Sequence, residues 1–218
     1  MKNKKVFVFD FDGVFYSGEH KFENIRNAIA QNKRKFLPNL TDAQYDQICQ
    51  NHPEWTQAVR GKNIVENIYK LKYIYPQYDI SVDGFNNWQS NDIYKIIIDF
   101  GQVIDTKVMK KLCKNYAVYV VSNSSQNHIH FYMKKLGVNP KWFKKVISNM
   151  FVEEDTTKKH YLKEILDAEK CLPQNAYMFG DTDESDLVPA RKLGMNDIFV
   201  ENSNDIPKYL EQILGKKL

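Results

Sequence analysis

The chain has 218 residues, of which 43% are hydrophobic, enough for one large or two small domains with a substantial core. Its 27% charged and 13% aromatic residues exclude a disordered or fibrous chain. A net charge of +4 is too small over this length to favour nucleic acid or a membrane, so we expect neither as a partner.

The first apolar segment, Val6–Phe9, has β-branched and aromatic residues without polar alternation, which is typical of a strand buried on both faces of a parallel sheet. Helical stretches separate it from four later candidate strands, at residues 117–121, 146–148, 176–179 and 197–200. This alternation predicts an α/β core, a Rossmann-like doubly wound parallel sheet with right-handed crossovers.

Residues 17–100 break the alternation, because their patterning is mostly helical. Candidate helices cover residues 22–36, 41–51, 62–74 and 87–99, with prolines between them. We therefore predict a core formed by residues 1–16 and 101–218, with an inserted helical domain at 17–100 that acts as a lid.

The cysteines and the N-terminus concern the cellular compartment. Cys49, Cys113 and Cys171 have no CxxC spacing, so the sequence supports neither a disulfide framework nor a zinc site. The apolar run that ends before Asp10 is too short for a signal peptide or a membrane span. A cytoplasmic protein is expected.

Asp10 and Asp12 lie at the end of the first predicted strand. Side chains alternate along an extended backbone, so the two carboxylates can point the same way, toward the sheet edge where ligands bind in open α/β folds. Carboxylates held close together there require a cation or a shared proton. A turn cap and a solvated aspartate are the alternative interpretation.

A second acidic segment, residues 180–186, follows the strand at 176–179. It does not fit an EF-hand loop, because Asp186 stands where a glycine is needed and Lys192 where a glutamate is needed. Some of its acids can cap the next helix, but there are more than one cap requires. Together with Asp10 and Asp12 they suggest a Mg²⁺ site.

Two further segments could bind an anion. Ser122 and Asn123 follow the strand at 117–121 and precede a helix, so a hydroxyl and exposed amides could hold phosphate there. Lys158 and Lys159 lie at the start of another helix, where cations oppose the helix dipole. A plain cap and a pair of solvated lysines are the alternatives.

In this order, the four segments resemble the motifs of the haloacid dehalogenase-like hydrolase superfamily. Residues 6–14 resemble its first motif, residues 120–123 its second, Lys158 or Lys159 its third, and residues 180–195 its fourth. The resemblance therefore covers nearly the whole chain, and it implies a Rossmann-like core with an inserted helical cap.

The resemblance also implies roles for individual residues. Asp10 would be the nucleophile that forms an aspartyl-phosphate, and Asp12 the general acid and base, with its main-chain carbonyl on the metal. Substrate phosphate would contact Ser122, Asn123 and Lys158, which is favoured over Lys159. Mg²⁺ would be bound by Asp10, Asp12, Asp181 and Asp186, with Asp183 a less favoured substitute for Asp186.

The implied activity is a Mg²⁺-dependent phosphatase acting on a small phosphorylated metabolite, such as a nucleoside monophosphate, a sugar phosphate or phosphoglycolate. Family members that act on carbon–halogen bonds lack a carboxylate at the position of Asp12, which favours phosphoryl transfer. Two alternatives stay open: a phosphosugar mutase of the same superfamily, and a catalytically idle binding protein with this fold.

Overall fold

The computed structural model describes residues 4–17, 41–51, 73–74, 76, 102–124, 126–148 and 158–218. The chain divides into two compact units. One comprises Met1–Glu19, Phe100–Asn149 and Glu154–Leu218, and the other comprises His20–Asp99 and Met150–Glu153.

Helix α2 (Asp42–Asn51), in the second unit, confirms the helix predicted at 41–51. The helices predicted at 22–36 and 87–99 lie outside the described residues. So does the one predicted at 62–74, apart from Tyr73 and Ile74, which are helical. The interpretation of this unit as a cap stays a prediction.

The first unit contains a five-stranded, fully parallel sheet with the order β5-β4-β1-β6-β7. Its strands are β1 (Val6–Phe9), β4 (Ala117–Ser122), β5 (Lys145–Ser148), β6 (Ala176–Gly180) and β7 (Asn196–Phe199). All five strands were predicted within one or two residues, and the Rossmann-like α/β fold is confirmed. Phe9 pairs with Val120 on one side and with Phe179 on the other, so β1, β4 and β6 end side by side.

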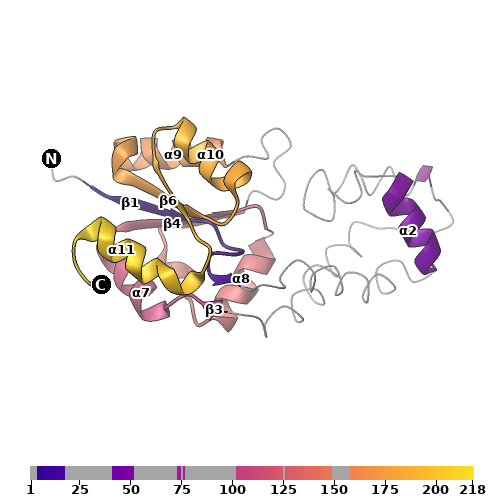
Figure 1. The fold of residues 1–218 in the computed structure, drawn as a ribbon, viewed down its shortest axis with the longest axis horizontal. Helices are drawn as coiled ribbons and strands as arrows, with labels where there is room; N and C mark the ends of the chain where they lie inside the picture. The colour runs from indigo at the N-terminus through magenta and orange to yellow at the C-terminus, as the bar shows by residue number, and fades with distance from the viewer. Residues whose placement is uncertain are drawn as a thin grey trace. The chain divides into compact units, whose positions relative to one another are not determined.

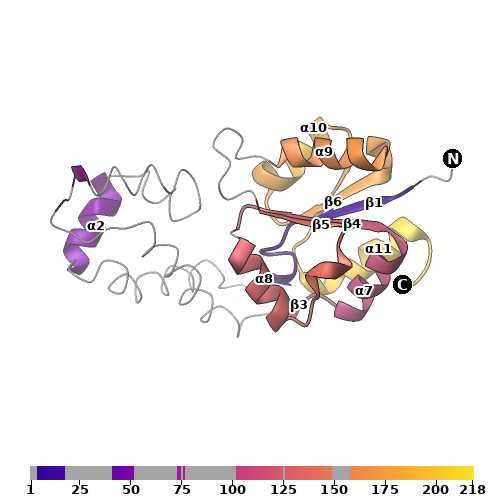
Figure 2. The ribbon, with the colours of Figure 1, turned by 180° about the vertical axis from the view of Figure 1, so that it is seen from behind.

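Helices cover both faces of the sheet. Figures 1 and 2 show α9 and α10 on one face and α7, α8 and α11 on the other. These helices are α7 (Thr106–Asn115), α8 (Gln126–Lys135), α9 (Lys159–Glu169), α10 (Val188–Lys192) and α11 (Ile206–Leu214). Short 3-10 helices, η3 (Pro140–Trp142), η4 (Pro173–Asn175) and η6 (Ser203–Asp205), lie in the connections.

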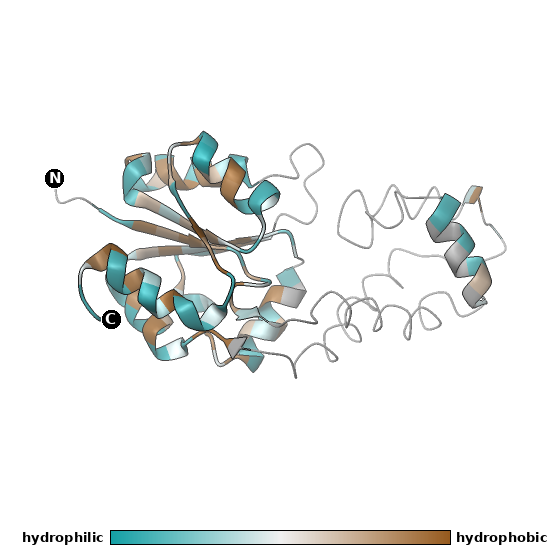
Figure 3. Cartoon of the chain, viewed as in Figure 1, coloured by the Kyte–Doolittle hydropathy of each residue, from teal (hydrophilic) through white to brown (hydrophobic). Residues whose placement is uncertain are grey.

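The alternation of side chains along β1 divides the core between these two layers. Val6 and Val8 belong to the buried cluster that includes Leu162 and Ile165 of α9. Phe7 and Phe9 face the other way and stack on Tyr177 and Phe179, with ring centroids 5.4 and 4.5 Å apart. All four β1 side chains are fully buried, and Figure 3 shows hydrophobic residues along the central strands.

Two local features were not predicted. Strand β2 (Tyr16–Ser17) pairs with β3 (Gln102–Val103) in an antiparallel ribbon, so Ser17 belongs to the first unit. A π-helical turn, η5 (Asp183–Leu187), lies between the acidic segment's first residues and α10. Two-residue strands and a π turn leave no periodicity for a sequence pattern to detect.

Within the described parts of the chain, no helix combines the length and the apolar character that crossing a bilayer requires.

Candidate active site

Asp10 lies at the carboxyl end of the central strand. It directly follows Phe9, and its amide donates a hydrogen bond of 2.8 Å to the carbonyl of Phe179, so the backbone continues its pairing with β6. Only 7% of the residue is exposed. Its side chain is therefore held at the sheet edge where ligands bind in open α/β folds.

Three carboxylates converge at this edge. Oxygen atoms of Asp10, Asp181 and Asp186 lie within 4.8 Å of one another. Asp181 directly follows β6 and Asp186 lies in η5, so the acidic segment meets the end of β1 as the sequence led us to expect. Asp186 is completely buried, whereas Asp181 is partly exposed. We call these three residues the acidic group.

Lys158 supplies positive charge to the acidic group. Its Nζ lies 2.5 Å from Oδ1 of Asp10 and 2.7 Å from Oδ1 of Asp186. Lys158 is 1% exposed, whereas Lys159 is exposed to solvent. Of the two lysines that the sequence left open, the structure brings Lys158 to the carboxylates.

The electrostatics of this arrangement fit a bound cation. Burial raises the pKa of Asp10 from 3.8 to about 7, and the neighbouring carboxylates add to the rise while Lys158 opposes it. Burial lowers the pKa of Lys158, but the charges of Asp10 and Asp186 outweigh that effect and raise it above 10.5. Three carboxylates thus face one ammonium group, and the excess negative charge suits a divalent cation with oxygen ligands such as Mg²⁺.

Two glycines leave the space that the acidic group occupies. Gly13 has a φ of +85°, which glycine adopts without strain, and a Cβ there would overlap the carboxylate of Asp181. A Cβ on Gly180 would overlap the side chain of Asp186. Steric exclusion of a Cβ atom therefore explains why glycine is required at these positions of the first and fourth motifs.

Asp12 has a different environment from Asp10. Its Oδ1 accepts a hydrogen bond from the hydroxyl of Tyr16, and its Oδ2 accepts one from the hydroxyl of Ser124. Its carboxylate is not part of the acidic group found among the described residues. The contribution of Asp12 to a metal site, predicted through its main-chain carbonyl, stays a prediction.

Neither hydrogen-bond partner of Asp12 could be predicted from the sequence. Ser124 lies in the loop that begins at Ser122, but no pattern connects it with a residue so distant in the chain. Tyr16 is four residues from Asp12 and 5% exposed, in a strand too short to predict. Burial, followed by the charge of Asp12, raises the pKa of Tyr16 well above 10.0, so its hydroxyl remains a donor.

Ser122 and Asn123 lie where β4 ends, next to the end of β1. Ser122 is 1% exposed, and its Oγ accepts a hydrogen bond of 3.2 Å from the amide of Ser124. Asn123 is partly buried. Both residues therefore lie at the sheet edge that carries the acidic group.

Asp183, the less favoured substitute for Asp186 as a metal ligand, lies on the surface. Its side chain is 58% exposed and forms an ion pair with Arg191, which also contacts Asp197 at 2.7 Å. Asp183 therefore joins η5 to α10 and β7 at the surface, and Asp186 is the residue of this turn that reaches Asp10 and Asp181.

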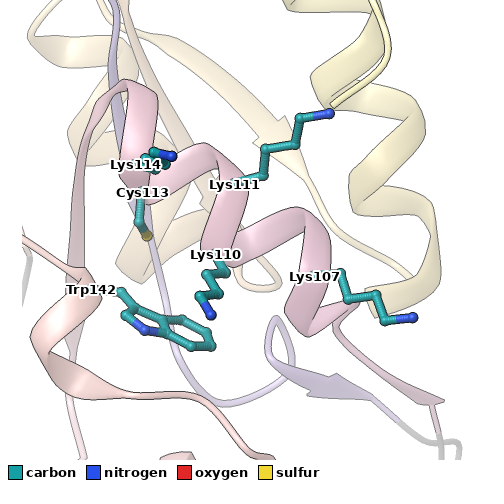
Figure 4. Close-up of a pocket in the computed structure, with 6 residues that line it drawn as sticks. All are labelled: Lys107, Lys110, Lys111, Cys113, Lys114 and Trp142. Atoms are coloured by element: carbon teal, nitrogen blue, oxygen red, sulfur yellow. The ribbon is translucent and has the colours of Figure 1, made fainter.

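A cavity of about 460 Å³ is lined by a different set of residues (Figure 4), namely Lys107, Lys110, Lys111, Cys113, Lys114 and Trp142. The ammonium of Lys110 lies over the ring of Trp142, 5.8 Å from its centroid. These residues come from α7 and η3, and none of them belongs to the acidic group.

Several solved structures have a similar fold, among them the following three. A 2-haloacid dehalogenase from Pseudomonas syringae pv. Tomato DC3000 has 14% identity and a TM-score of 0.56, over 96% of this chain and 99% of that one. The putative HAD-hydrolase YfnB from Bacillus subtilis, bound to magnesium, has 17% identity and a TM-score of 0.59, over 98% and 100%.

The third is a mutant HAD family enzyme from Bacteroides thetaiotaomicron in complex with magnesium and inorganic phosphate. It has 14% identity and a TM-score of 0.56, over 90% of this chain and 93% of that one. At such identities these similarities establish the fold. A comparison with curated proteins finds no match.

The family assignment comes from the sequence as a whole. The model of the haloacid dehalogenase-like hydrolases matches residues 4–194, which include the first three motifs, the fourth except its last residue, and every residue of the acidic group. The parallel sheet and its carboxyl-edge carboxylates agree with that match. The chain therefore belongs to the haloacid dehalogenase-like hydrolase family.

Proposed function

We propose that this hydrolase is a Mg²⁺-dependent phosphatase that acts on a small phosphorylated metabolite through an aspartyl-phosphate on Asp10. The observation that carries the proposal is that Asp10 and Asp12, at the end of β1, have different surroundings. Asp10 lies within the acidic group and contacts Lys158, whereas the carboxylate of Asp12 is held separately by two hydroxyl groups.

In the first step, an oxygen of Asp10 attacks phosphorus, and the bond from phosphorus to the leaving oxygen breaks. Asp12 gives its proton to that oxygen, which leaves as an alcohol. In the second step, Asp12 takes a proton from a water molecule as the water attacks phosphorus. The bond to Asp10 breaks, inorganic phosphate leaves, and Asp12 is again protonated for the next cycle.

Other residues of the chain would hold the phosphoryl group. The ammonium of Lys158 and the hydroxyl and amides at Ser122 and Asn123 are suited to the oxygens of the transferring group. Mg²⁺, held by Asp10, Asp181 and Asp186, would offset the charge on those oxygens when bound. The similar structure from Bacteroides thetaiotaomicron is a complex with magnesium and inorganic phosphate, which supports proposing these two bound species here.

Dehalogenation is the main alternative to phosphatase activity, because one similar solved structure is a 2-haloacid dehalogenase. By the resemblance, family members that act on carbon–halogen bonds lack a carboxylate at the position of Asp12. The presence of Asp12, with both of its oxygens hydrogen-bonded, therefore favours phosphate esters. We further propose that residues 20–99, which belong to the second unit, act as a cap that selects a small substrate, and that the protein works in the cytoplasm.

The test is phosphate release from a panel of nucleoside monophosphates, sugar phosphates and phosphoglycolate, with Mg²⁺ or with EDTA. We expect release with Mg²⁺, none with EDTA, and none from Asp10→Asn, whereas Asp183→Asn, altered on the surface, retains activity. Halide release from 2-chloropropionate is measured in parallel. Halide without phosphate would contradict the proposal, and an isomerised sugar phosphate without free phosphate would identify a mutase instead.

A further inference from the structure

We propose that Tyr16 and Ser124 are positioning residues that orient the carboxylate of Asp12 for proton transfer. This inference rests on the proposed function, in which Asp12 is the general acid and base. The last torsion angle of an aspartate side chain is broad, so the side chain alone does not define the plane of its carboxylate. Proton transfer to one particular atom requires that plane to be defined.

Both oxygens of Asp12 have a hydroxyl partner. Tyr16 donates to Oδ1 and Ser124 donates to Oδ2. The two donors come from different elements, Tyr16 from β2 and Ser124 from the loop after β4. Rotation of the carboxylate about its bond to Cβ would break both hydrogen bonds, so together they fix its plane.

The first donor is itself held in place by packing. The ring of Tyr16 stacks on Tyr132 of α8, with centroids 5.2 Å apart and planes 20° apart, and meets Phe11 edge-on at 5.9 Å. These contacts involve the ring, which a phenylalanine would preserve. The hydroxyl adds nothing to them, and burying it is costly unless it is hydrogen-bonded, as it is here to Asp12.

The second donor is held by its backbone. The amide of Ser124 donates to Oγ of Ser122 at 3.2 Å, and its carbonyl accepts a hydrogen bond of 2.6 Å from the hydroxyl of Ser148. Ser124 therefore connects Asp12 to Ser122, which we propose binds the substrate phosphate. The proton donor and the phosphate contact share one hydrogen-bonded frame.

The experiment compares Tyr16→Phe, Ser124→Ala and Ser124→Thr, each in the wild-type and the Asp12→Asn backgrounds. Substrates are p-nitrophenyl phosphate, whose phenolate leaves without much protonation, and glycerol 1-phosphate, whose alkoxide needs a proton. Single-turnover kinetics measure the first step, and thermal melts check that each variant is folded.

We expect Tyr16→Phe and Ser124→Ala to lower kcat about 10- to 100-fold with little change in KM. This loss is smaller than the full contribution of general acid–base catalysis, because Asp12 itself remains. In single turnovers the loss is larger for glycerol 1-phosphate than for p-nitrophenyl phosphate. Ser124→Thr restores the hydroxyl and recovers activity. In the Asp12→Asn background neither Tyr16→Phe nor Ser124→Ala causes a further loss, because both act through Asp12.

Two results would overturn the proposal while leaving the proposed function intact. One is wild-type kcat in both variants although Asp12→Asn is impaired. The other is an equal loss in the wild-type and Asp12→Asn backgrounds, which indicates a general structural role. If the wild-type protein released no phosphate, or if Asp12→Asn were fully active on glycerol 1-phosphate, the proposed function would fail and this inference with it.

Discussion

Lys158 and Asp10, 148 residues apart in the chain, form a buried ion pair with a separation of 2.5 Å. The same ammonium contacts Asp186 at 2.7 Å, so one lysine joins the ends of β1, η5 and the start of α9. A lysine at the first turn of a helix opposes the helix dipole, and these two carboxylates explain why it is tolerated there.

The first prediction separates this lysine from its neighbour. Lys158→Gln is expected to lower phosphatase activity about 100- to 1,000-fold, the effect of removing one group that stabilises a developing charge. Because it leaves buried carboxylates unpaired, we also expect it to lower the free energy of unfolding by about 3–5 kcal/mol. Phosphate release and urea unfolding measure the two effects.

Lys159→Gln is the matched control, because Lys159 is exposed and adjacent in sequence. It is expected to change neither quantity appreciably. Similar losses of activity in both variants would argue against a specific role for Lys158.

The second prediction concerns the space beside Asp181. Gly13→Ala is expected to displace the Asp181 carboxylate and weaken Mg²⁺ binding about 10- to 100-fold, as disruption of groups around metal ligands does. The positive φ adds a strain of roughly 1–2 kcal/mol. Isothermal titration with Mg²⁺ measures the affinity.

Gly137→Ala is the control for strain. Gly137 also has a positive φ, of +70°, but a Cβ there meets no atom within 4 Å. We expect this variant to lose stability without losing Mg²⁺ affinity. Equal affinities in the two alanine variants would show that the space beside Gly13 is unimportant.

The third prediction is a pH dependence of stability. Burial of Glu169 would raise its pKa, but hydrogen bonds from Lys4 and Tyr119 outweigh burial and lower it below 4.5. Because the folded-state pKa is the lower one, this stabilisation is present above about pH 4.5 and is lost as the pH falls through the folded-state value.

Glu169→Gln should therefore cost about 1 kcal/mol at pH 7, typical of a partly exposed charged hydrogen bond. The difference from the wild-type protein should shrink below pH 4.5. Urea unfolding at a series of pH values measures it, and a difference that stayed constant down to pH 3 would refute the assignment.

The fourth prediction uses the lysines of α7. Lys107, Lys110, Lys111 and Lys114 are three or four residues apart, so like charges are neighbours on one side of the helix. Lys107→Glu places an acid in the first turn and opposite charges at i and i+4. We expect the free energy of unfolding to rise by about 0.5–1 kcal/mol.

Lys114→Glu is the counterpart at the other end of α7. Both substitutions replace like-charge pairs with opposite charges, but an acid in the last turn opposes the helix dipole, so Lys114→Glu should have a free energy of unfolding about 1 kcal/mol below that of Lys107→Glu. Thermal melts at low salt compare the two variants, and equal stabilities would mean that the dipole does not govern this helix.

The strands could be predicted because each is a short apolar run between helical stretches. Val6–Phe9 is apolar at every position, as a strand covered on both faces must be, and all four residues are buried. Asp10 could be placed for the same reason, since it is the first polar residue after that strand. By contrast, β2 and β3 depend on one another for pairing, and neither has a pattern of its own.

By itself, the sequence determined the α/β fold and the chemical character of the site, because strand periodicity and motif order are local properties of the chain. Only the tertiary structure decided which lysine meets Asp10, that Asp186 and not Asp183 turns inward, and that Tyr16 and Ser124 contact Asp12. These contacts depend on how packing orients side chains at the ends of neighbouring strands. The spacing of residues along the chain does not determine which of those side chains come within hydrogen-bond distance.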